Sequence, residues 1–293
     1  MSRKFHRRMA ASHSLRAIAL YEIAVARRAV GNAAGREAEA IHEVRRRLKR
    51  LRALIRLPGR HFPAFRRENR AFRDLGRDLA GAREAEVLAA SFDATAGRAG
   101  IEASPELRDR VVAAGAHAGA SGRLSKVLVE AVEPGLAAAA ERAHHWHFDT
   151  RGFALVGPGA RRTYRRMRRA GRAARLATTA LTLHEWRKRV KYHAAQLDLL
   201  SVVAPNVLAG RVELADRLAD ILGEHHDLDQ LRTAIAACAA VPEEDGRRLE
   251  AAIASRAAEL EVEAFRLGDA LGAESPKAFR RRLVSRWHAW RGR

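Results

Sequence analysis

Apolar residues recur every three to four positions along nearly the whole chain, and strict alternation of apolar and polar residues is scarce. Because an α-helix has about 3.6 residues per turn and a strand repeats every two residues, this pattern predicts an all-α protein. Two helix starts are clearly marked by a serine that can cap the helix and a proline that fits its first turn, at Ser104-Pro105 and Ser275-Pro276. We expect helices at residues 14–30, 37–57, 63–80, 82–96, 105–117, 121–147, 159–175, 180–201, 206–222, 225–239, 242–270 and 276–291.

Two segments of the chain occur twice and in the same order. IHEVRRRLKRLRALIRL at 41–57 aligns with LHEWRKRVKYHAAQLDL at 183–199, an offset of 142 residues. LAGAREAEVL at 79–88 then aligns with LGEHHDLDQL at 222–231, an offset of 143 residues. The shared order and the nearly equal offset indicate a duplicated helical unit.

The duplication predicts how the chain is divided. We expect two antiparallel bundles of the four-helix type, related by pseudo-symmetry, at residues 1–150 and 151–293. The boundary is expected within FDTRGFALVGPG at 148–159, where glycines and a proline cluster.

The repeated helix has one apolar stripe and one strongly basic face in each copy. Trp186 and Val190 lie on the apolar stripe of the second copy, where His193 joins them. The basic face of the first copy carries His42, Arg45, Arg46, Lys49, Arg52 and Arg56, and that of the second carries His184, Arg187, Lys188 and Lys191. A solvated helix face usually mixes acidic and basic residues, because pairs one turn apart then attract each other. Like charges on adjacent turns repel, so these faces are typical of a site that binds an anion.

Overall charge supports the same interpretation. The formal net charge is +21, which attracts polyanions such as nucleic acid, anionic lipid or polymeric phosphate. Arginine grips two phosphate oxygens at once, lysine adds a point charge, and histidine adds a donor whose charge depends on pH. A third basic segment, ARRTYRRMRRAGRAAR at 160–175, has eight arginines and no acid. It can extend the same surface, with Tyr164, Arg165 and Arg168 as its candidate contacts.

Composition excludes some other classes. Cys238 is the only cysteine, so neither a disulfide nor a cysteine-based zinc site can form within the chain. Arg16 and Glu22 interrupt the apolar part of the N-terminal segment, which makes a cleaved signal peptide unexpected. No stretch approaches the ~20 uncharged apolar residues that cross a bilayer. We therefore expect a soluble cytoplasmic protein without a membrane span.

These motifs resemble the CHAD family, the conserved-histidine α-helical domain. LHEWRKRVKYH followed by LGEHHDLDQLR is similar to the second half of that family, and IHEVRRRLKRLRALIRL to the signature of its first half. PGARRTYRRMRRA resembles the segment before the second histidine helix, and the likeness extends over roughly 10–291. The resemblance implies two pseudo-symmetric four-helix bundles that gather histidines and basic residues on one surface. It also implies binding of inorganic polyphosphate and association with polyphosphate granules, with no catalysis.

The resemblance also implies which residues bind the polymer. In the first half they are His42, Arg45, Lys49, Arg50 and Arg52, in the second His184, Arg187, Lys188, Lys191 and Tyr192, and in the two later motifs Arg83 and His226. One motif departs from the family, because GAREAEVL has Glu84 and Glu86 where the second half has Asp227 and Asp229.

Two alternatives remain beside polyphosphate binding, namely nucleic-acid binding and a metal-dependent phosphohydrolase. HHDLD at 225–229 is compatible with a metal-dependent phosphohydrolase, but adjacent histidines lie about 100° apart on a helix and share a metal poorly. Nucleic-acid binding requires aromatic residues among the cations for base stacking, and only Tyr192 meets this requirement. ELEVEAF at 259–265 lacks the lysine of a triphosphatase Glu-x-Glu-x-Lys motif. We therefore expect no enzymatic activity, cofactor or bound metal, with nucleic acid as a non-specific competitor.

Overall fold

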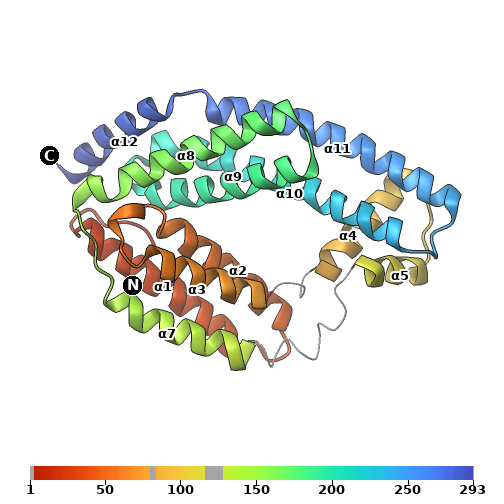
Figure 1. Ribbon diagram of the computed structural model, residues 1–293, viewed down its shortest axis with the longest axis horizontal. Helices are drawn as coiled ribbons and strands as arrows, with labels where there is room; N and C mark the ends of the chain where they lie inside the picture. Colours follow the sequence, from red (N-terminus) through yellow and green to blue (C-terminus); the bar gives the residue numbers. More distant parts are fainter. Residues whose placement is uncertain (1–2, 80–83, 116–127, 293) are drawn as a thin grey trace.

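The computed structural model describes residues 3–79, 84–115 and 128–292, and this part of the chain contains eleven α-helices and no strand (Figure 1). The prediction of an all-α protein is confirmed. The α-helices are α1 (Ala11–Gly31), α2 (Glu37–Leu54), α3 (Phe65–Asp78), α4 (Glu84–Ala99), α5 (Pro105–Gly115), α7 (Glu133–His144), α8 (Gly152–Leu176), α9 (Ala180–Leu200), α10 (Pro205–Ala237), α11 (Glu243–Gly272) and α12 (Pro276–Arg291). Short turns of other helix types are η1 (Gly59–His61), η2 (Leu128–Val132) and η3 (Ser201–Val203).

Helix boundaries differ from the predictions by more than three residues at three places. Of the helix expected at 121–147, residues 121–127 lie outside the described residues, and α7 begins at Glu133, after the turn η2. The segments expected as separate helices at 206–222 and 225–239 form one continuous helix, α10, because Gly223 and its neighbours do not interrupt it. Helix α8 begins at Gly152, within the stretch expected to contain the boundary between the two halves, and it contains Pro158 in its first two turns. Ser275 caps α12 through a hydrogen bond from Ala278 N to its Oγ (3.1 Å), as the sequence indicates.

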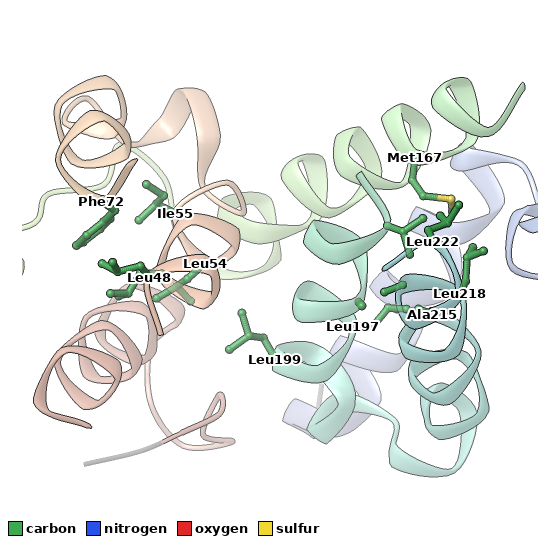
Figure 2. Close-up of a cluster of buried hydrophobic side chains, with 14 of the residues drawn as sticks. Leu48, Leu54, Ile55, Phe72, Met167, Leu197, Leu199, Ala215, Leu218 and Leu222 are labelled. Atoms are coloured by element: carbon green, nitrogen blue, oxygen red, sulfur yellow. The ribbon is translucent and has the colours of Figure 1, made fainter. Parts of the chain in front are cut away.

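The helices pack in two groups that touch along α2 and α9. In the first group, α1 contacts α2 and α7, and α3 contacts α2 and α7. In the second, α8, α9, α10 and α11 form a ring in which each helix contacts the next and α11 returns to α8, while α12 covers α8. Figure 2 shows the apolar cores on both sides of this contact, with Leu54 of α2 and Leu199 of α9 between them. Leu54 and Leu199 are buried, so apolar packing joins the two groups.

Helices α4 and α5 lie at the far end of α10 and α11 (Figure 1). Gly115 allows α5 to approach α10, because a Cβ there would lie 2.6 Å from the Ala234 Cβ. Arg248 of α11 donates hydrogen bonds to the carbonyls of Ala99 (2.7 Å) and Gly100 (2.8 Å) at the end of α4. Residues on the N-terminal side of the expected boundary thus pack on helices from the other side, and the division into 1–150 and 151–293 stays a prediction.

A close approach of backbones joins α8 to the end of the first histidine helix. Gly159 of α8 lies against the turn after α2, where a Cβ would come within 2.0 Å of the Leu57 carbonyl oxygen. Only glycine fits at such a contact. The approach places the arginines of α8 beside the last turn of α2.

Candidate anion-binding site

The centre of the basic surface lies where α9 meets α10. His184 of α9 and His226 of α10 are in ring contact, with centroids 4.7 Å apart and planes tilted by 50°. Arg187 follows one turn after His184, and its Nε lies 3.8 Å from the position that a Cβ on Gly223 would occupy. Because Gly223 has no side chain, the guanidinium group packs directly against α10. The site is therefore built from two helices that are widely separated in sequence.

Helix α2 adds cations from the first half of the chain. Burial and the positive charges of Arg187 and Lys49 together lower the pKa of Lys191 to about 8, while Asp227 and Asp220 oppose this shift. Lys49 belongs to α2 and Lys191 to α9, so the two histidine helices place cations within electrostatic reach of each other. That both basic faces form one binding surface stays a prediction, and this proximity of Lys49 and Lys191 is what supports it.

The two histidines are held in the neutral form. Burial lowers the pKa of His226 to about 4, and the charges of Arg187 and His184 act in the same direction. Burial also lowers the pKa of His184, with Lys188 and Arg187 as further causes. Desolvation and like charges both disfavour the imidazolium form. Without a bound anion, both residues therefore become protonated only at a lower pH than an ordinary histidine, whose pKa is about 6.5.

Two buried nitrogen atoms of this cluster have no hydrogen-bond partner among the residues that the structure describes. They are Arg187 Nε, which is a donor, and His184 Nδ1, whose role depends on the tautomer. A buried donor without a partner costs about 1–3 kcal/mol, so such atoms mark places where an acceptor would be stabilising. Burial also lowers the pKa of Arg187, and Asp227 opposes this effect. An anion with several oxygen acceptors satisfies both requirements of the cluster, charge and hydrogen bonding.

A second group of cations lies at the end of α2. The Arg56 guanidinium stacks 4.0 Å from the centroid of the Tyr192 ring, and Arg52 lies 5.8 Å from the same ring. Burial lowers the pKa of Arg56 to about 10, and the charges of Arg52, Arg189 and Arg166 contribute to this effect. Cations that depress one another's pKa values are a favourable place for a polyanion, because its charge removes the repulsion.

Comparison with known families decides how this arrangement is classified. A model of the CHAD domain matches residues 10–236 of the 293-residue chain. The chain belongs to the CHAD family. No curated protein and no solved structure matches the chain. The matched range contains both histidine helices and the His226 segment, so the clusters described above lie within the CHAD domain.

Two predicted CHAD contacts face inward instead of toward solvent. Tyr164 is buried, and its hydroxyl donates to the carbonyls of Glu274 (2.9 Å) and Leu271 (3.2 Å). Arg50 is largely covered and forms ion pairs with Glu22 (2.9 Å) and Asp198 (2.6 Å). On a helical wheel Arg50 lies outside the basic face, whereas the family resemblance implies that it binds the polymer. Its covered position in the structure is consistent with the wheel. Both side chains are thus engaged with other parts of the protein, and their role in binding stays a prediction.

The remaining predicted residues differ in how freely they can bind. Arg46 and Lys188 are exposed but pair with acids on their own helices, Arg46 with Glu43 (2.6 Å) and Lys188 with Glu185 (2.5 Å). Arg45 donates to the Leu79 carbonyl at 2.6 Å.

The other predicted positions lie on α2 and α8 or outside the description. His42 is exposed on α2 and Arg165 is exposed on α8. Arg168 faces α11, where its Nε is 3.7 Å from the Cβ position of Gly272, so it lies apart from the α2–α9 surface. Arg83 lies outside the described residues.

Sequence reasoning missed four arginines around the end of α2, namely Arg60, Arg162, Arg166 and Arg189. Burial lowers the pKa of Arg162, and the charges of Arg166, Arg60 and Arg165 contribute. Arg166 and Arg189 also act on Arg56. Arg162 and Arg166 are one turn apart in a segment already recognised as basic, so their spacing gave a signal. That they lie beside α2 depends on the glycine contact between α8 and the turn after α2, which no local pattern reveals.

The acidic residues of HHDLD contribute to the electrostatics of the site. The pKa values of Arg187, Lys191 and His226 are all lowered, and the acids oppose this shift, Asp227 at Arg187 and Lys191 and Asp229 at His226. His225 points to α11, where its Nε2 lies 3.0 Å from Glu261 Oε1. Across 3–79, 84–115 and 128–292, no group of three or more His, Cys, Asp or Glu side chains is arranged to hold a metal ion. Nor does any described helix have the length and apolar character needed to cross a membrane.

Proposed function

We propose that this CHAD protein binds inorganic polyphosphate, without altering it chemically, through one surface built by α2, α9 and α10. The observation that carries the proposal is the cluster of His184, Arg187 and His226, together with Lys191 and Lys49. The charges of Lys191, Arg187 and Lys49 repel one another in the absence of an anion, and the buried Arg187 Nε has no acceptor among the described residues. Membership of the CHAD family is consistent with polyphosphate binding in general.

The second cation group lets the same polymer extend along the molecule. Arg52 and Tyr192 lie on helices that carry the first cluster, Arg56 lies in the turn after α2, and Arg162 and Arg166 continue the positive charge onto α8. A linear anion with one charge per phosphate can contact both groups at once. We infer that the two repeated segments act as equivalent halves of this surface, and that binding directs a cytoplasmic protein to polyphosphate granules.

The deciding experiment is competition between polyanions across a salt series. The purified protein is titrated with polyphosphate, duplex DNA and RNA at several salt concentrations. We expect polyphosphate to bind far more tightly than either nucleic acid, with an affinity that falls steeply with salt because each cation that contacts the polymer displaces counterions. Equal or tighter binding of DNA at moderate salt would contradict the proposal and favour a nucleic-acid-binding protein.

The absence of catalysis is tested separately. We expect no orthophosphate release from bound polyphosphate, with or without divalent metal ions. Steady release by the pure protein, lost in Asp227→Asn or Asp229→Asn, would instead indicate a phosphohydrolase.

A further inference from the structure

A cavity of about 250 Å³ opens between α8 and α11. Helices α8, α9, α10 and α11 pack in a ring, so the α8–α11 edge lies opposite the α9–α10 edge that carries His184 and His226 (Figure 1). The cavity is lined by three arginines of α8 and by apolar side chains of α8, α9 and α11, namely Arg168, Arg172, Arg175, Met167, Trp186 and Phe265. Asp269 is the one acidic residue of the lining, so the cavity combines a net positive charge with aromatic surface, away from the proposed polyphosphate site.

Trp186 and the glycines around it form one wall. A Cβ on Gly268 would lie 2.5 Å from the Trp186 ring, and one on Gly171 would lie 3.0 Å from Trp186 Nε1, so both backbones rest directly on the indole. The ring stacks on Phe265, with centroids 5.6 Å apart and planes 15° from parallel. Trp186 is 2% exposed, and its Nε1 has no hydrogen-bond partner within the described residues. A buried indole N–H normally has a partner, so this donor beside the cavity calls for an acceptor.

The arginines are not all engaged by the protein. Arg175 pairs with Asp269 (2.7 Å) and lies 4.8 Å above the Phe265 ring. Arg168 and Arg172 form no ion pair within the part of the chain that the structure describes. Their guanidinium groups suit the oxygens of a phosphate group, while the Arg175–Phe265 stack suits a flat ring.

We propose that this cavity binds a small phosphate-bearing molecule with a flat heterocyclic ring, of the nucleoside monophosphate class. The cavity volume is slightly below the ~300–1,000 Å³ of sites for drug-sized molecules, so the ligand is no larger than a nucleoside monophosphate. The phosphate lies between Arg168 and Arg172, and the ring stacks on the open face of the Arg175 guanidinium, which is half exposed and whose other face covers Phe265. Orthophosphate or a bare polyphosphate end would use the arginines and leave the aromatic wall without a function. This binding is independent of the proposed polyphosphate site.

The test is a calorimetric titration of the full chain with adenosine 5′-monophosphate. We expect one saturable site. Arg172→Gln should weaken binding at least ~10-fold through loss of a charge-assisted hydrogen bond. Ala273→Trp should abolish binding by blocking the mouth of the cavity, since Ala273 is an exposed lining residue that tolerates a larger side chain. Arg169→Gln is the matched control, because Arg169 is exposed on the same helix and does not line the cavity. Unchanged melting temperatures establish that the variants are folded.

Three results would overturn the proposal. One is the absence of saturable binding up to about 5 mM ligand, which corresponds to less than about 3 kcal/mol of binding free energy. Another is displacement of the nucleotide by equimolar orthophosphate or tripolyphosphate, which would show that the cavity recognises only charge. The third is displacement by saturating long-chain polyphosphate, which would assign these arginines to the polymer surface. Nucleotide binding that persists in Arg187→Gln, while polyphosphate binding is weakened, would show that the two sites are separate.

Discussion

Arg50 of α2 donates a 2.6 Å hydrogen bond to Asp198 of α9, across the contact between the two histidine helices. The same guanidinium donates to Glu22 of α1 at 2.9 Å, and Lys4 pairs with Asp198 at 3.2 Å. Beside this network, Gln196 Nε2 donates to the Ala53 carbonyl at 2.9 Å. These bonds fix the register of α2 against α9, and therefore the position of Lys49 relative to Lys191.

Asp198→Asn should uncouple the two basic helices. It should lower the free energy of unfolding by about 1–3 kcal/mol, because a largely covered hydrogen bond between charged groups is lost. It should also remove the coupling between Lys49→Gln and Lys191→Gln in polyphosphate binding, measured with a double-mutant cycle in each background. Coupling that is equally strong without Asp198 would show that the network does not align the site.

Trp186→Ala should be strongly destabilising. The side chain is buried between two glycine backbones and Phe265, so its removal leaves a large void, and we expect a loss of about 3–5 kcal/mol in denaturant unfolding. Leu181→Ala is the control on the same helix. Leu181 is 78% exposed, and its replacement should change stability by less than ~0.5 kcal/mol. Similar losses in both variants would contradict the packing described here.

Arg187→Gln should separate binding from folding. Arg187 has a buried, unpartnered Nε and lies among like charges, so the change should leave the melting temperature equal or slightly higher. Polyphosphate binding should weaken about 10- to 100-fold, as expected for loss of one or two charge-assisted contacts. Arg247→Gln, an exposed position on α11 that pairs with Glu243, should bind normally. Equal effects of the two substitutions would mean that only net charge matters.

Polyphosphate affinity should rise as pH falls from about 7 toward about 5. The pKa of His226 is about 4 without ligand, and a bound polyanion raises it. At a pH between the free and the bound pKa, the complex holds more protons than the free protein, so acid favours binding. His184, whose pKa is also lowered, contributes in the same direction.

The pH dependence can be assigned to the cluster by mutation. His226→Gln should flatten the affinity profile, whereas His288→Gln, on α12, should not change it. Calorimetric titration in two buffers with different ionisation enthalpies measures the proton uptake directly. Binding without proton uptake at pH 6 would contradict the assignment.

Acid should destabilise the fold through His193. This histidine is buried against Tyr164 and Phe279, and burial lowers its pKa to about 3. The unfolded chain binds a proton near ~6.5, before the folded protein does, so stability is present at neutral pH and is lost as pH falls from about 6.5 toward about 3. Between pH 7 and 5 the loss due to His193 is about 2 kcal/mol. His193→Phe should remove this part of the loss in urea unfolding at the two pH values, and a loss as large as in the parent protein would contradict the assignment.

The sequence alone determined the helical class, the repeated histidine helix and most cations of the site. These features depend on spacing within one helix, because the helical period places residues such as His184, Arg187 and Lys191 on one face wherever the helix lies. The charge argument also needed no structure, since crowded like charges in a segment without acids repel in any fold.

Only the tertiary structure decided which cations are paired within the protein and which lie among other cations. Arg50 and Arg187 both belong to arginine-rich helices, but Arg50 meets Glu22 and Asp198 from other helices, whereas Arg187 lies beside His226 with an unpartnered Nε. Tyr164 is on a basic helix and yet is buried, because α11 supplies carbonyl acceptors for its hydroxyl. The physical reason is the same in each case. Burial and charge pairing are set by residues far apart in the chain, and packing of α2, α8, α9 and α10 brings them together.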